Sequence, residues 1–131
     1  MKRPLSFAAL GLALALSSCK DGPAAGELAV DLGTPSADDG AIMFTATASA
    51  LSEATITGAS AACSGCKVFV VKVNDTQYKG VLTGNITAGT IFRVGVSDTK
   101  KPANYSVVIN SVSSRTFVLR NSLTGYTVTL K

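Results

Sequence analysis

Alternation of apolar and polar residues with a period of two is the feature that most constrains the fold of this chain. It is clearest at the end, where Tyr126, Val128 and Leu130 are separated by single threonines. Successive side chains of a β-strand point to opposite faces, so this period predicts strands that bury one face. Similar segments, separated by Gly, Asn, Asp and Ser, cover residues 27–32, 41–48, 54–57, 67–73, 78–83, 90–97 and 105–112. Seven or eight short strands spaced in this way predict an all-β fold, a single antiparallel β-sandwich.

The same alternation predicts which residues face the core. Ile42 and Phe44 fall on one phase and Met43 on the other, and residues 67–73 are apolar on both phases, which favours a central strand. The aromatic rings mostly lie on the apolar phase, so we expect them in the core. They are Phe44, Phe69, Phe92, Phe117, Tyr78, Tyr105 and Tyr126.

The first 19 residues have the pattern of an export signal. Lys2 and Arg3 precede an apolar run that ends in Leu16-Ser17-Ser18-Cys19. The run is shorter than the roughly 20 apolar residues that a membrane-spanning helix needs, and together with the basic start it predicts a cleaved signal peptide. An ordinary secretory cleavage site that happens to contain a cysteine is the alternative.

Leu16-Ser17-Ser18-Cys19 resembles the lipobox of bacterial lipoprotein precursors. The resemblance implies diacylglycerol on the thiol of Cys19, cleavage before that residue and acylation of the new amino terminus, so the membrane would be a partner through lipid. Lys20 stands where an aspartate would retain a lipoprotein in the inner membrane, which favours the outer membrane where one exists. The expected organisation is a signal peptide at 1–18, a lipidated cysteine and tether at 19–26 and a β-sandwich at 27–131.

Four segments of the expected sandwich resemble cohesin-like and other immunoglobulin-like domains of bacterial envelope and extracellular proteins. The resemblance lies in the order of strands and implies architecture without binding residues. The segments are Leu28–Leu32, Gly40–Phe44, Gly89–Val94 and Gly125–Leu130.

Composition argues against several functions. The formal net charge is +4, and it falls to +2 without Lys2 and Arg3, so no basic stripe indicates nucleic-acid binding. The chain has no histidine, which removes the commonest general base and the commonest metal ligand. We therefore expect a protein that is not an enzyme and has no metal site and no cofactor.

Cys63-Ser64-Gly65-Cys66 is the most chemically distinctive motif after the signal. With Cys19 lipidated, Cys63 and Cys66 are the remaining thiols, and an oxidising compartment favours a disulfide between them. A redox-active pair, with Lys67 stabilising a thiolate, is the alternative. A thioredoxin-like pair opens a helix, whereas this one precedes a strand, so a structural disulfide is favoured.

Asp38-Asp39-Gly40 could offer carboxylates to calcium, but two adjacent acids supply too few ligands, and a turn is the favoured interpretation. The leading functional prediction is a non-catalytic, lipid-anchored envelope module that binds or supports an envelope protein or polysaccharide. The alternatives are a thiol-disulfide redox protein that uses Cys63 and Cys66, and a glycan-binding module, which would need exposed tyrosines among Tyr78, Tyr105 and Tyr126.

Overall fold

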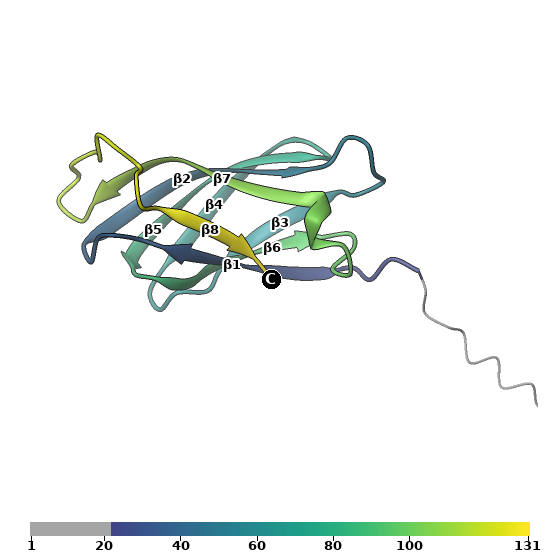
Figure 1. Cartoon of the computed structure of the whole chain (residues 1–131), viewed down its shortest axis with the longest axis horizontal. Helices are drawn as coiled ribbons and strands as arrows, with labels where there is room; N and C mark the ends of the chain where they lie inside the picture. Colours follow the sequence, from purple (N-terminus) through teal and green to yellow (C-terminus); the bar gives the residue numbers. More distant parts are fainter. Residues whose placement is uncertain (1–21) are drawn as a thin grey trace, which may run out of the picture.

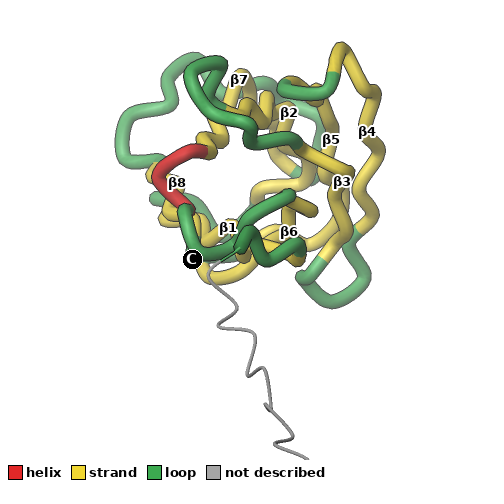
Figure 2. Tube along the Cα trace, turned by 90° about the vertical axis from the view of Figure 1, so that its right-hand side faces the viewer, coloured by secondary structure: helices red, strands yellow, loops and turns green. Residues whose placement is uncertain are grey.

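The fold is an antiparallel β-sandwich of two four-stranded sheets, seen in a computed structural model that describes residues 22–131 (Figure 1). Sheet A has the strand order β3-β6-β1-β8 and sheet B the order β4-β5-β2-β7, and Figure 2 shows the two layers along the strands. The predicted fold class is confirmed. The strands are β1 (Gly26–Gly33), β2 (Asp39–Ala48), β3 (Ile56–Ala61), β4 (Lys67–Asn74), β5 (Gln77–Ile86), β6 (Gly89–Val96), β7 (Tyr105–Ser114) and β8 (Thr127–Leu130).

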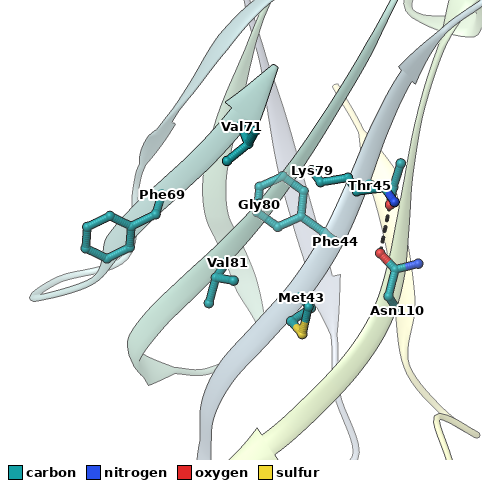
Figure 3. A pocket seen from close by; sticks show the side chains of 9 residues that line it. All are labelled: Met43, Phe44, Thr45, Phe69, Val71, Lys79, Gly80, Val81 and Asn110. Atoms are coloured by element: carbon teal, nitrogen blue, oxygen red, sulfur yellow. Dashed lines mark hydrogen bonds between the residues drawn. The ribbon is translucent and has the colours of Figure 1, made fainter. Parts of the chain in front are cut away.

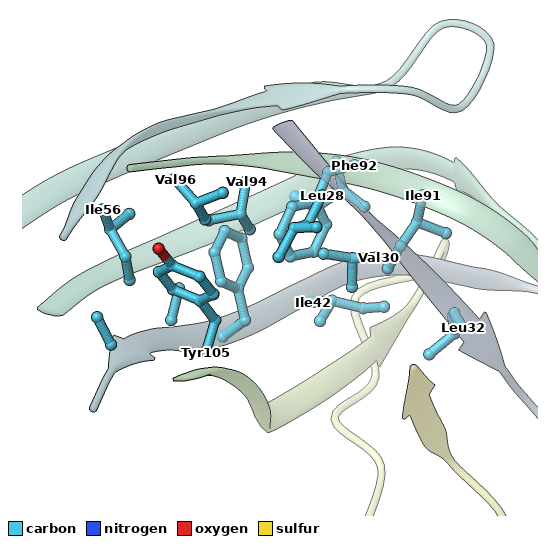
Figure 4. Close-up of a cluster of buried hydrophobic side chains, with 14 of the residues drawn as sticks. Leu28, Val30, Leu32, Ile42, Ile56, Ile91, Phe92, Val94, Val96 and Tyr105 are labelled. Atoms are coloured by element: carbon cyan, nitrogen blue, oxygen red, sulfur yellow. The ribbon is translucent and has the colours of Figure 1, made fainter. Parts of the chain in front are cut away.

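The core lies between the sheets and consists of the inward residues of the alternating strands (Figure 4). Phe44 of sheet B stacks on Phe92 of sheet A with ring centroids 4.2 Å apart, so one aromatic pair joins the two layers. Gly80 makes room for this pair, because a Cβ atom there would collide with the Phe44 ring and lie 2.9 Å from Cγ1 of Val70. Sequence alternation placed Ile42, Phe44 and Phe92 correctly in the core.

The strands give the sandwich two distinct ends. The chain enters β1 at Gly26, and we call this the anchor end (Figure 1). The opposite, distal end gathers the connections between β1 and β2, β3 and β4, β5 and β6, and β7 and β8. The Cys63–Cys66 pair and Asp38 therefore share one end of the molecule, although they are distant in sequence.

β4 lies at the edge of sheet B, so the prediction of a central strand for residues 67–73 is wrong. Val68 and Val70 of this strand pack on the core, whereas the apolar residues of its other phase are exposed. The rule that doubly apolar strands are central assumes that both faces are covered. Here one of the faces is bare.

The strand boundaries also differ from prediction. The expected strand at 54–57 is β3 and runs instead over Ile56–Ala61, and Asp39 and Gly40, expected in a turn, begin β2. One short 3-10 turn, η1 (Pro102–Asn104), precedes β7. Within residues 22–131 no helix has the length and apolar character needed to cross a membrane.

Candidate functional site

The outer face of sheet B is apolar and exposed, and we call it the apolar face. Phe69 and Val71 of β4 are 62% and 70% exposed, Met43 of β2 is 52% exposed and Val108 of β7 is 55% exposed. Single exposed apolar residues are ordinary, but a contiguous group of them on a monomer commonly marks a binding surface.

A groove of about 430 Å³ runs across the apolar face. Figure 3 shows Phe69 and Val71 on β4, Val81 on β5 and Met43 on β2 around it. At its other side the hydroxyl of Thr45 donates a hydrogen bond to Oδ1 of Asn110, 2.8 Å away. The lining is thus mainly apolar with a small polar margin, the usual make-up of a site that buries part of a partner.

The charge on this face has one sign. Lys67 and Lys79 lie on the outward phase of β4 and β5, in register with Thr83 and Val71 respectively. The single carboxylate in the four strands of sheet B, Asp39, is fully buried. A partner for this surface is therefore expected to be apolar with acidic groups at its margin.

The outer face of sheet A has the opposite character. Asp31 of β1 forms a salt bridge with Lys131 and accepts a hydrogen bond of 2.6 Å from the Thr90 hydroxyl. These two contacts, Lys131 first, hold the pKa of Asp31 below its ordinary value. The hydroxyl of Ser60 also donates to Glu27 at 3.3 Å. Sheet A presents paired polar groups to water.

An exposed apolar loop extends the apolar face at the distal end. Phe117 is 92% exposed and has a φ of +66°, a left-handed conformation that is uncommon for a bulky residue. Ser114 holds the loop in this shape, because its amide donates to the Val118 carbonyl (2.8 Å) and its hydroxyl accepts from the Val118 amide (3.1 Å). A second hollow, of about 290 Å³, lies beside Phe117 and reaches Ala41 and Thr83 of sheet B.

A buried charge network supports this loop. Asp39 Oδ1 accepts hydrogen bonds from Arg120 (3.1 Å) and from the hydroxyl of Tyr126 (2.8 Å), and Oδ2 accepts one from Thr34 (2.7 Å). Arg120 also pairs with Asp38. The bonds to Asp38 and Asp39 raise the pKa of Arg120, and burial raises that of Tyr126. Every buried side-chain N or O atom among residues 22–131 has a hydrogen-bond partner, and those of Asp39 are within this network.

Sequence reasoning missed this network and the two exposed rings. Asp39 and Arg120 are 81 positions apart, and no local pattern connects them. Phe69 and Phe117 were expected in the core and are exposed instead, because β4 has a bare outer face and Phe117 lies in a loop. The available sequence signal was in residues 67–73, which are apolar on both phases and precede a hairpin turn at Asn74. This pattern is compatible with a strand at the edge of a sheet.

Cys63 and Cys66 are joined in a disulfide with Cα atoms 5.3 Å apart, as the sequence predicts. The bridge closes the connection between β3 and β4 and packs against β5, where a Cβ on Gly84 would lie 2.9 Å from Cα of Cys66. Lys67 directly follows the bridge in the sequence.

The remaining sequence predictions concern the lipid anchor, the tyrosines and a metal site. Cys19 and the signal lie outside the described residues. Tyr105 is buried, Tyr78 is half-buried and the half-buried Tyr126 is bonded to Asp39, so the three tyrosines form no exposed cluster. Among residues 22–131 no three His, Cys, Asp or Glu side chains are grouped in a way that could hold a metal ion.

Fold and surface together define a two-sheet antiparallel sandwich with one bare apolar face. Comparisons with models of protein families, with curated proteins and with solved structures give no significant match.

Proposed function

We propose that this protein is a non-catalytic, lipid-anchored module of the bacterial cell envelope that binds a partner through its apolar face. The observation that carries the proposal is the contrast between the two outer faces of the sandwich. Sheet A exposes paired charges, whereas sheet B exposes Phe69, Val71 and Met43 around a groove. Leaving such a surface in water has no structural benefit, and covering it by a partner removes apolar area from water.

The sequence supports the anchor. Two or more acyl chains hold a protein stably in a membrane, whereas one holds it marginally, so a di- or triacylated Cys19 would keep the sandwich at the surface. About seven residues separate Cys19 from Gly26, a reach of roughly 25 Å at full extension. The tether enters at the anchor end, so the exposed loop around Phe117 lies at the far end of the domain.

Metabolic labelling with palmitate tests the anchor. Cells that produce the full chain should incorporate the label, and the Cys19→Ala variant should not. Label that still enters the variant would remove the lipid anchor from the proposal.

Site-specific photocross-linking in the same cells tests the apolar face. We would place benzoylphenylalanine at Met43, on the apolar face, and at Arg93, an exposed position on the outer face of sheet A, as the matched control. An adduct with a second envelope component at position 43 and none at 93 is expected. Equal adducts at both positions, or none at 43, would contradict the proposal.

A further inference from the structure

We infer that two copies of this chain pair antiparallel through the free edges of their β4 strands, centred on Val71, to form one continuous sheet. This goes beyond the proposed function, because the apolar face could bind its partner with or without such a pair.

The edge of β4 is free to accept a strand. β4 is eight residues long and its ladder is made with β5 on one side. No backbone hydrogen bond of residues 22–131 joins its other side to another strand. A row of unpaired N–H and C=O groups of this length is a template for another strand. Lysine often protects such edges, but Asp75 neutralises Lys72 here through an ion pair of 2.6 Å.

Of the other three sheet edges, the edge of β7 is partly covered and those of β8 and β3 are short. The end of β7 is covered by its own loop, because Leu119 pairs with Ser113 and the Arg120 amide donates to the Val112 carbonyl at 2.8 Å. β8 has four residues and β3 has six. Pairing through β4 uses the same edge of both copies, so it gives a closed pair rather than a filament.

The side chains of β4 complement themselves in this register. Residues directly opposite in an antiparallel pair share a face. Centring on Val71 places Val71 opposite its twin and Phe69 opposite Val73 of the second copy, where β4 has a register shift against β5. All of these residues are exposed in the single chain. Aromatic and β-branched pairs of this kind stabilise neighbouring strands.

Charge complementarity selects this register. Lys67 makes no salt bridge within residues 22–131, and centring on Val71 places it at the β4–β5 turn of the second copy, beside the Lys72–Asp75 ion pair. Centring on Val70 would instead oppose Lys67 and Val73. The twofold axis then gives two opposite-charge contacts per pair, one at each end of the ladder.

The arrangement also fits two anchors in one membrane. The twofold axis of an antiparallel edge pair is normal to the sheet, so the Gly26 residues of the two copies lie at the same height along it. Both copies enter through β1 of sheet A, on the side away from the apolar face. The joined apolar faces would then point away from the membrane.

Zero-length carbodiimide coupling of the unmodified protein in intact cells tests the register. Lys67 and Asp75 lie at opposite ends of β4, whose seven residue steps span about 23 Å, so an amide between these two residues must join two chains. We expect that cross-link in peptide mass spectra of the dimer band. A dimer band without it, or no dimer band, would overturn the inference.

Cysteine substitutions give an independent test. With Cys63 and Cys66 bridged, oxidation of full-chain Val71→Cys should yield a covalent dimer, and Val108→Cys should not, although it is an exposed valine of the same face. Adding Lys67→Glu should lower the dimer yield severalfold by opposing two acids, and adding both Lys67→Glu and Asp75→Lys should restore it. Equal dimer yields at 71 and 108, or no effect of Lys67→Glu, would contradict the register, and the photocross-link at Met43 would be unaffected.

Discussion

The two outer faces of this sandwich are built from the same strand alternation and yet differ in what they show to water. On sheet A, the carboxylate of Asp31 is paired with Lys131 and accepts a hydrogen bond from Thr90. On sheet B, Phe69, Val71 and Met43 have no such cover. Both faces are stable parts of one fold, so the difference is not required by folding. It marks sheet B as the side on which a partner is expected.

The comparison also separates residues that hold the fold from residues that would hold a partner. The Asp39 network and the Phe44–Phe92 stack join the sheets, and no buried side-chain N or O atom among residues 22–131 lacks a hydrogen-bond partner. The exposed residues of the apolar face touch water in the single chain. Substitutions in the first group should change stability, and substitutions in the second should change binding.

The largest effect on the fold is expected from Asp39→Ala, which removes the carboxylate that ties β2 of sheet B to Tyr126 and Thr34 beside sheet A. Because Arg120 and Tyr126 would lose their shared partner, the variant should lose about 3 kcal/mol of unfolding free energy, the lower end for a broken buried pair. Urea unfolding followed by circular dichroism measures the loss. Asp38→Ala, which removes the exposed partner of the same arginine, should cost much less, and equal losses would contradict this account.

Gly80→Ala should destabilise next, by about 1–3 kcal/mol, because its Cβ atom would overpack the Phe44 ring beneath sheet B. Gly95→Ala on sheet A is the matched control. Its Cβ atom would meet the hydroxyl of Thr57, which can rotate away, so the change should stay within about 0.5 kcal/mol. Thermal unfolding of the two variants compares a position on the inner face of sheet B with a position on the outer face of sheet A.

Removing the disulfide with Cys63→Ala and Cys66→Ala should cost about 2 kcal/mol or less, since the bridge closes a short loop. The photocross-link at Met43 should persist, because the bridge lies outside the apolar face. A variant that keeps its stability but loses the cross-link would favour a thiol-based function instead.

The smallest effect is expected on the polar face, from Asp31→Asn. The folded state lowers the pKa of Asp31, so its ionised form contributes stability above the unfolded value of 3.8. That contribution is lost as pH falls through the lower folded pKa, and wild type and variant should then converge. Unfolding midpoints measured from neutral to acidic pH check the direction. A difference that grows on acidification would have the wrong sign.

The sequence was sufficient for the class of fold because period-two alternation determines which side chains face a core. Ile42, Phe44 and Phe92 were placed correctly for this reason. It was insufficient for the candidate site, because the exposure of outward side chains depends on whether another element covers that face of the sheet. Alternation within a strand does not predict such a cover. Phe69 and Phe117 were misplaced accordingly. Pairing of Asp39 with Arg120 depends on the long connection between β7 and β8, which no local pattern encodes.

Side-chain oxidation tests the apolar face most directly. The chain has two methionines, and Met43 lies on that face, half exposed in the single chain. Hydroxyl radicals convert an accessible methionine to its sulfoxide, which mass spectrometry quantifies. Met43 should be oxidised severalfold less in intact cells than in the purified full chain, because a partner covers it in the envelope. Equal oxidation in the two preparations would contradict a binding role for this face.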